Sequence, residues 1–249
     1  MARKYHSPSS INTYLRCPRK YYFKYIKKLK EKPSIHLFRG SAVHEAIAKF
    51  TKNFSRHSLD AEDMRLGLIG YFDSAWQKSW PHIKRLCLSK QEINDFYDES
   101  VKMLIRWLQK HISASRKRIS CPESEVKLFS KKHGVMGIID AIYTVNGKVY
   151  LVDYKTGKKA VVTDDIKVQM VIYALLYKEN FEKKPHMLSI NFLKSQTIRR
   201  FKVTDEVIRN AIKLCKRMHE KTFSDDESKY PCTCGGWCEK DFIGKNGGC

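Results

Sequence analysis

The chain has 249 residues, of which 42% are hydrophobic and 30% charged, proportions that are typical of a folded domain and exclude wholesale disorder. Its 48 lysines and arginines against 26 aspartates and glutamates give a net charge of +22, which predicts a polyanionic partner because basic side chains displace counterions from phosphates. No apolar run could cross a membrane, and the first residues lack an apolar signal region. We therefore expect a cytoplasmic, intracellular protein (host cytoplasm if viral) without membrane contact.

The first half of the chain is predicted to be helical. A helix capped by Ser9 or Ser10 should begin near residue 7 and be broken in two at Pro18. Three more helices follow, the last two forming a helical insertion at 60–113; the predicted ranges are 41–54, 60–80 and 90–113.

The second half alternates strands and helices, which predicts a mixed α/β core whose central sheet is flanked by helices. The expected strands are 125–129, 135–145, 148–154, 187–193 and 199–203. One helix is expected at 163–177, and a last one at 205–223 capped by Thr204. The tail, residues 224–249, is polar and rich in glycine and cysteine.

A tight hairpin carries the clearest chemical signal. With Asn146-Gly147 as a two-residue turn, Asp140 lies opposite Asp153 on the same sheet face. Two carboxylates that close repel each other unless a cation neutralises them, and Mg²⁺ favours such ligands. Lys155 points to the same face, where it can position an attacking water and stabilise charge on phosphorus. The alternative is a surface hairpin with an ordinary ion pair.

These residues resemble the PD-(D/E)XK nuclease superfamily, and three further motifs resemble its RecB-like branch. They are Gly40-Ser-Ala-Val-His44, Gly137-Ile-Ile-Asp140 and Gln169-Met-Val-Ile-Tyr173. The resemblance runs from residue 7 to the C-terminus, apart from the helices at 60–113. It implies a restriction-endonuclease-like fold, a single nuclease domain over 1–249, and a DNA nuclease dependent on Mg²⁺ or Mn²⁺.

The resemblance also implies roles for single residues. His44, Asp140 and Asp153 would hold the metal ion, and Lys155 would position the nucleophilic water. Gln169 and Tyr173, four residues apart on one helix face, would brace the site or touch the substrate backbone. Glu125 is a weaker candidate for the edge of the site. His44 as a core histidine, and Gln169 and Tyr173 as plain packing, remain alternatives.

The eight cysteines, without a signal region, indicate metal or cluster ligation rather than disulfides. In the same branch of nucleases, one N-terminal cysteine and three C-terminal cysteines hold a 4Fe–4S cluster. Cys17 resembles the first, and Cys234, Cys238 and Cys249 resemble the other three, so the tail at 224–249 would pair with Cys17. Cys232 is a spare that could replace Cys234 or Cys249. Two alternatives are a zinc site made by the four tail cysteines alone and no metal.

A basic aromatic stretch precedes these elements and includes Arg19, Lys20 and Tyr21. Rings that stack on bases and cations that track phosphates suit single-stranded nucleic acid. The alternative is an amphipathic helix with its rings in the core.

The resulting hypothesis is a metal-dependent DNA exonuclease that acts on single strands or ends in recombination, replication or CRISPR-type processing. A helicase or a recombination or adaptation protein would be its partner. One rival is a non-catalytic nucleic-acid-binding scaffold with the same fold, and another is a nuclease or binder directed at RNA.

Overall fold

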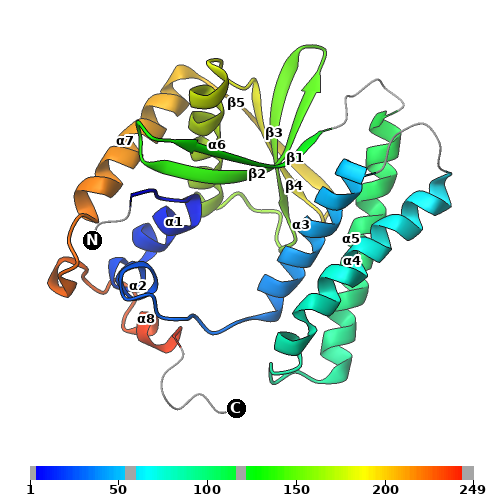
Figure 1. Ribbon diagram of the computed structural model, residues 1–249, viewed down its shortest axis with the longest axis horizontal. Helices are drawn as coiled ribbons and strands as arrows, with labels where there is room; N and C mark the ends of the chain where they lie inside the picture. Colours follow the sequence, from blue (N-terminus) through cyan, green and yellow to red (C-terminus); the bar gives the residue numbers. More distant parts are fainter. Residues whose placement is uncertain (1–3, 54–59, 116–121, 243–249) are drawn as a thin grey trace.

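The computed structural model describes residues 4–53, 60–115 and 122–242 (Figure 1). The helical first half comprises α1 (Pro8–Arg16), α2 (Pro18–Tyr21), η1 (Tyr22–Ile26), α3 (Ile35–Asn53), α4 (Ala61–Ile83) and α5 (Lys90–Ser115). The second half comprises β1 (Glu123–Ser130), β2 (Val135–Val145), β3 (Lys148–Lys155), α6 (Asp164–Phe181), β4 (Met187–Phe192), β5 (Thr197–Lys202), α7 (Asp205–Lys221), η2 (Glu227–Lys229) and α8 (Trp237–Lys240). None of the helices in these ranges is long and apolar enough to cross a membrane.

The five strands form one mixed sheet in the order β1-β2-β3-β4-β5. Strands β3 and β4 are parallel and α6 connects them, whereas the other neighbouring pairs are antiparallel. The predicted hairpin register is confirmed, since Val145 pairs with Lys148 and Ala141 with Val152. The turn residues Asn146 and Gly147 both have positive φ, of 50° and 73°, as a type I′ turn requires.

Helices cover both faces of this sheet, and each face has its own apolar core (Figure 1). One core joins the sheet to α6, α7 and α1, with Ile139 and Leu151 among its strand residues. The other joins it to α3, α4 and α5, with Ala141 and Val152 from the strands. The predicted mixed sheet between helices is therefore confirmed.

The helix starts differ from the prediction in two places. Ser7, not Ser9 or Ser10, caps α1, and its side chain accepts the backbone N–H of Ser10. Helix α3 begins at Ile35 rather than near 41. Gly40 does not interrupt it, because Ile35 and Arg39 are buried and hold the first turns against the core. The break at Pro18 is confirmed, as is Thr204 as the cap of α7.

The basic aromatic stretch is part of the core, contrary to the prediction that its rings bind bases. Tyr21 is fully buried and lies against Tyr14 and Tyr230. Arg19 donates to the carbonyl of Tyr230 at 2.8 Å, and Lys20 donates to Asp241 at 2.6 Å. These three residues tie the N-terminal helices to the C-terminal segment, so they do not form a surface for nucleic acid.

Candidate active site

Three acidic residues lie side by side on neighbouring strands. The pairs Ser124–Ala141 and Val126–Ile139 place Glu125 of β1 opposite Asp140 of β2. Asp140 and Asp153 directly follow the last pair of the β2–β3 ladder, Ala141 with Val152. The N–H of Tyr154 donates to Asp140 Oδ2 at 2.8 Å and fixes that carboxylate. The register that the tight turn sets therefore extends up to Asp140 and Asp153, whose charges interact, and β1 adds a third acid.

Helix α3 supplies an imidazole to this row. His44 Nδ1 lies 3.2 Å from Asp140 Oδ1. Ligand atoms of His44, Glu125 and Asp140 all lie within 4.8 Å of one another. One nitrogen and two carboxylate oxygens at such separations suit a divalent cation, so Glu125 is closer to the centre of the site than the sequence indicated.

Asp153 lies beside this group and faces the lysine. It is 1% exposed, neither of its oxygens accepts a hydrogen bond of good geometry, and its Oδ2 is 2.8 Å from Lys155 Nζ. Lys155 Nζ donates to Gln169 Oε1 at 2.7 Å, and Gln169 Nε2 donates to the Tyr173 hydroxyl at 2.8 Å. Two residues of α6 therefore hold the lysine, as the spacing of Gln169 and Tyr173 predicted.

The electrostatics of the site favour binding of a cation. Burial, followed by the charge of Asp140, raises the pKa of Asp153 to about 6, and the same two causes raise the pKa of Glu125. Burial would lower the pKa of His44, but the charge of Asp140 and its hydrogen bond outweigh this and raise it to about 9. Because carboxylates that burial and mutual repulsion make harder to ionise favour a nearby cation, the residues present fit a divalent ion.

A groove of about 750 Å³ opens onto His44 and Glu125. Its walls come from α3 and β1 and carry Lys49, Lys52 and Lys127. Cations beside a carboxylate–histidine centre can attract a phosphodiester backbone and hold it there.

The arrangement of acids, histidine and lysine agrees with the comparison of sequences. A profile of the PD-(D/E)XK nuclease superfamily matches residues 5–241. The chain belongs to this superfamily. Its fold is accordingly the restriction-endonuclease-like fold, a mixed sheet flanked by helices, with a cysteine group at the C-terminal end.

Two relatives illustrate the superfamily. The chain is 27% identical over 207 residues to one subunit of the ATP-dependent helicase/deoxyribonuclease of Carboxydothermus hydrogenoformans, an alignment that covers 71% of this chain and 18% of that protein. The chain therefore matches about a fifth of that relative's length. A solved structure of a candidate exonuclease from Eubacterium rectale has a TM-score of 0.60 and 14% identity, covering 98% of this chain and 90% of that one. This likeness shows a shared fold.

A distortion of β1 and β2 positions the acids of the candidate site, and the sequence did not predict it. Glu125 has φ of +55°, in the left-handed region that residues other than glycine rarely adopt. On β2, Ile139 faces the α6 core but Ala141 faces the α3 core, although regular alternation would put both on one side. The two strands therefore change face at Glu125 and Asp140.

Arg39 is a second feature that the sequence did not single out. It is 4% exposed, donates to Glu99 at 2.6 Å, and donates to the carbonyl of Thr156 at 2.9 Å. Lys194 pairs with the same Glu99. Because Thr156 follows Lys155, this network anchors the end of β3 to α3 and α5. In the sequence, the only signal was the position of this arginine five residues before His44.

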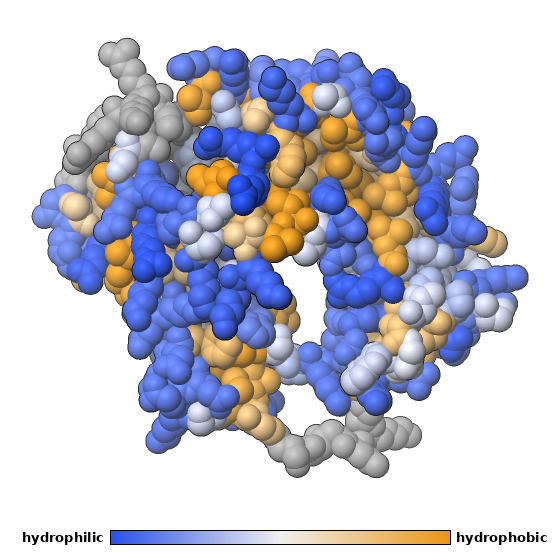
Figure 2. Space-filling view, turned by 180° about the vertical axis from the view of Figure 1, so that it is seen from behind, coloured by the Kyte–Doolittle hydropathy of each residue, from blue (hydrophilic) through white to orange (hydrophobic). Residues whose placement is uncertain are grey.

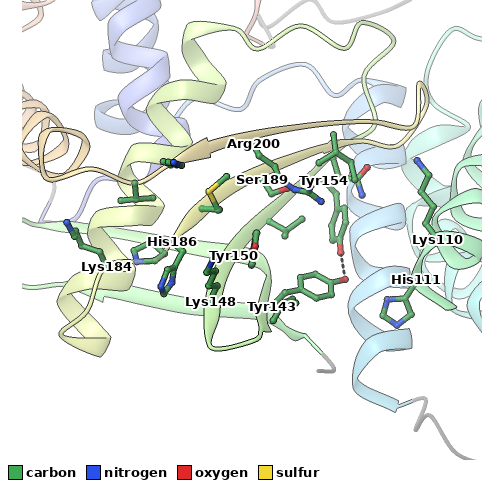
Figure 3. A pocket seen from close by; sticks show the side chains of 18 of the residues that line it. Lys110, His111, Tyr143, Lys148, Tyr150, Tyr154, Lys184, His186, Ser189 and Arg200 are labelled. Carbon is green, nitrogen blue, oxygen red and sulfur yellow. Dashed lines mark hydrogen bonds between the residues drawn. The ribbon is translucent and has the colours of Figure 1, made fainter. Parts of the chain in front are cut away.

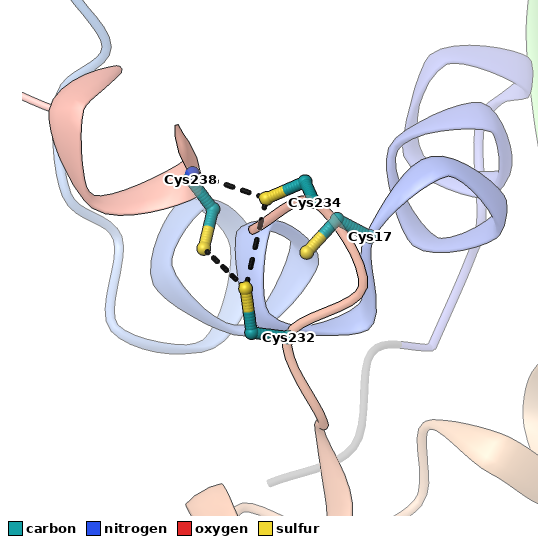
Figure 4. Close-up of side chains that lie close together, drawn as sticks. All are labelled: Cys17, Cys232, Cys234 and Cys238. Atoms are coloured by element: carbon teal, nitrogen blue, oxygen red, sulfur yellow. Dashed lines mark hydrogen bonds between the residues drawn. The ribbon is translucent and has the colours of Figure 1, made fainter. Parts of the chain in front are cut away.

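Four thiols gather where the N-terminal helices meet the C-terminal segment (Figure 4). Cys17 lies between α1 and α2, and Cys232, Cys234 and Cys238 come from the C-terminal segment. Their sulfur atoms all lie within 4.8 Å of one another. Burial would raise the pKa of Cys17, but hydrogen bonds from the backbone of Thr233 and Lys20 outweigh it and lower the pKa to about 6.

The pairing of Cys17 with the tail follows the prediction, and Cys232 takes part in it. Cys249 lies outside the described residues. Cys232 Sγ is 3.7 Å from Cys234 Sγ and 3.6 Å from Cys238 Sγ. A tetrahedral zinc with bonds of about 2.3 Å spaces its sulfurs by about 3.8 Å, whereas an iron–sulfur cluster spreads its thiolates further apart. Four thiolates are chemically suitable donors for either group, and the spacing of the three C-terminal sulfurs matches zinc. One cysteine departs from the expectation of metal ligation, since Cys87 is disulfide-bonded.

Proposed function

We propose that the protein is a metal-dependent DNA nuclease that degrades strands from their ends. The observation that carries the proposal is the row Glu125, Asp140 and Asp153 with His44 at one side and Lys155 at the other. This arrangement favours a catalytic protein over a scaffold, because a buried carboxylate beside a positioned lysine is what metal-assisted hydrolysis requires.

Each side chain has a defined task in hydrolysis. His44, Asp140 and Asp153, with Glu125 beside them, would hold Mg²⁺ or Mn²⁺, which would polarise the phosphate and acidify a water. Lys155 Nζ, fixed by Gln169, orients the attacking water and stabilises negative charge on the phosphoryl oxygens. Tyr173 holds Gln169 through its hydroxyl. The lysines of the groove bind the backbone on either side of the reacting phosphate.

A preference for ends is supported by the shape of the molecule. Figure 2 shows an opening through the molecule, which lies between the α1–α2 region and α3 and above the segment that leads from η1 to α3 (Figure 1). This segment carries four exposed lysines: Lys27, Lys28, Lys30 and Lys32. A basic rim of this kind suits a single strand entering by its end.

The four thiols support a structural cofactor. We propose that Cys17, Cys232, Cys234 and Cys238 hold a 4Fe–4S cluster, as the family resemblance implies, with zinc as the alternative. Ligation by the four thiolates would cross-link the C-terminal segment to the start of α2. Iron and zinc analysis with a visible absorption spectrum of anaerobically purified protein tests this. One zinc and no colour would contradict the cluster.

The relative from Carboxydothermus carries both helicase and deoxyribonuclease in its name. We extend this likeness to propose that the present chain acts on strands that a helicase activity exposes. Recombination, replication and CRISPR-type processing all produce such ends, and the proposal covers these processes as a class.

The central experiment is a cleavage assay with Mg²⁺ or Mn²⁺ on end-labelled single strands, duplexes and RNA of the same sequence. We expect shortening of DNA single strands from one end and no reaction in EDTA. Binding of DNA without cleavage under every metal condition would favour the scaffold, and preferential cleavage of RNA would favour the RNA-directed alternative.

Replacing Lys155 by alanine should lower kcat by roughly 10²-fold, the usual effect of removing one preorganised donor. Binding of uncut DNA should change little, because the groove lysines remain. Lys158→Ala, an exposed lysine in the loop that follows, is the matched control. Equal rates for the Lys155 variant and the parent would remove this lysine from the mechanism.

A covalently closed single-stranded circle should resist cleavage under conditions that degrade the linearised strand. The physical reason is that a closed strand presents no end to the opening. Gel analysis of both forms at equal nucleotide concentration provides the measurement. Conversion of circles to linear molecules at a similar rate would identify an endonuclease.

A further inference from the structure

A second recess, of about 800 Å³, lies on the opposite side of the hairpin from α6. It occupies the sheet face that α3, α4 and α5 cover only in part, and the C-terminal half of α5 closes one side (Figure 3). No residue lines both this recess and the catalytic groove. The recess is therefore a separate surface feature of the described chain.

The floor of the recess is an aromatic platform. Strand register forms a row across four strands, in which Tyr143 pairs with Tyr150, Tyr150 with Met187, and Met187 with Lys202. Both tyrosines are partly exposed and point into the recess (Figure 3). The hydroxyl of Tyr143 lies 3.2 Å from that of the buried Tyr154, which holds the ring in place. Two rings on adjacent strands thus face the recess, and a hydrogen bond holds one of them.

The rim of the recess is cationic. The charged residues that line it are Lys110, Lys148, Lys184, Arg200 and Lys202, and no aspartate or glutamate lines it. Lys184 is paired with Asp205. Within the described parts of the chain, Lys148, Arg200 and Lys202 form no ion pair with an acidic side chain, and all three are exposed. The surface therefore has uncompensated positive charge around an apolar centre.

The combination of partly exposed tyrosine rings and exposed cations favours single-stranded nucleic acid as the ligand. Exposed bases stack on aromatic rings, and neighbouring cations contact the phosphates, whereas a duplex keeps its base faces hidden. We propose that the recess is a second binding site for single-stranded nucleic acid, where bases stack on Tyr143 and Tyr150 and phosphates contact Lys148 and Lys202. The proposal rests on the proposed function because it takes a nucleic-acid strand as the ligand. It adds a second site, separate from the catalytic groove, that retains the strand.

Binding is to be measured by fluorescence anisotropy with a labelled oligothymidine of about ten nucleotides, within the range that such surfaces hold. An Asp153→Asn background in EDTA keeps the oligonucleotide intact. Tyr150→Leu should weaken binding at least fivefold, because it removes a stacking ring. Lys148→Gln with Lys202→Gln should lower the slope of log affinity against log salt by about 1.4, since each phosphate contact to a single strand contributes about 0.7.

Matched neutralisation of Lys213 and Lys216, which are exposed on α7, should leave the slope and the affinity unchanged. An oligothymidine carrying 5-iodouracil should crosslink on irradiation to a peptide that contains Tyr143 or Tyr150. The lysine variant alters only exposed side chains, so it keeps the proposal testable if Tyr150→Leu fails to fold.

Unchanged affinity and salt slope in the recess variants, with crosslinks elsewhere, would overturn the proposal. Competition by polyglutamate as effective as by oligothymidine, together with no effect of Tyr150→Leu, would also overturn it and identify a docking face for an acidic protein. Neither outcome concerns catalysis, which is judged by metal-dependent cleavage in the parent protein. Failure of this site and failure of the proposed function are therefore distinguishable.

Discussion

Asp153→Asn is expected to reduce cleavage by roughly 10³-fold or more and, at the same time, to stabilise the metal-free protein. The first effect follows because a carboxylate that would hold the divalent cation is lost, and such an ion supplies several kcal/mol of transition-state stabilisation. The second follows from the raised pKa of Asp153, whose causes are burial and the charge of Asp140. A carboxylate with a raised pKa in the folded state disfavours folding when it is ionised.

The unfolded chain holds the proton of an aspartate less tightly, with a pKa near 3.9, than the folded protein does, with a pKa of about 6. Above about pH 6 the folded protein therefore carries an ionised, poorly solvated group, and folding loses free energy there. Asparagine removes that charge, so unfolding in EDTA at pH 7.5 should need about 1 kcal/mol more, or roughly 2–4 °C in Tm.

Asp98→Asn on the exposed side of α5 is the matched control and should change neither quantity. Thermal unfolding in EDTA and the cleavage assay give the two readouts on the same preparations. A variant that lost activity and also lost several degrees of Tm would mean that Asp153 serves packing, and its assignment to the metal centre would fail.

How much the sequence predicted depends on how local each contact is. Asp140 and Asp153 could be aligned because a two-residue turn fixes the register of the strands that follow. Lys155 followed from the alternation of side chains, and Gln169 with Tyr173 from the helical repeat. Each of these predictions needs only one element or one turn.

The features that were underestimated depend on contacts between distant segments. Glu125 comes to the centre only because β1 changes face at its left-handed residue, and no pattern in 123–130 encodes that change. Arg39 anchors the end of β3 only through Glu99 and the carbonyl of Thr156, which are remote in sequence. Tyr21 was ambiguous for the same reason, because alternating rings and cations fit either a nucleic-acid surface or a core helix until Tyr230 packs against it.

The cysteines illustrate a third case, in which the sequence offered more donors than a site needs. Five cysteines, namely Cys17, Cys232, Cys234, Cys238 and Cys249, compete for four positions. The structure gathers the first four. Backbone groups hold three of them: the N–H of Cys238 donates to Cys234 Sγ at 3.2 Å, the N–H of Gly236 donates to Cys232 Sγ at 3.3 Å, and the backbone of Thr233 and Lys20 donates to Cys17. Backbone donors to sulfur are a common means of stabilising thiolate ligands.

The four gathered thiols predict which substitutions remove the metal. Cys232→Ser should abolish the visible absorption of the purified protein and its bound iron, or its bound zinc if that metal occupies the site. It should also lower Tm by roughly 5–15 °C, because the cross-link between α2 and the C-terminal segment is lost. The expected loss of stability is comparable to that caused by removing a structural disulfide, about 2–5 kcal/mol. Cys249→Ser should retain metal and Tm.

Cys215→Ala controls for the loss of a cysteine as such, because this buried thiol belongs to the α6–α7 core and is remote from the metal group. It should lose some stability through packing but keep full metal content. If Cys249→Ser loses the metal while Cys232→Ser keeps it, then Cys249 is the fourth ligand. A cofactor that holds the C-terminal segment beside α2 also holds the lysine-rich segment that leads to α3, because Lys32 donates to the carbonyl of Asp241. Loss of the metal should therefore reduce cleavage of single strands even though His44, Asp140 and Lys155 remain unaltered.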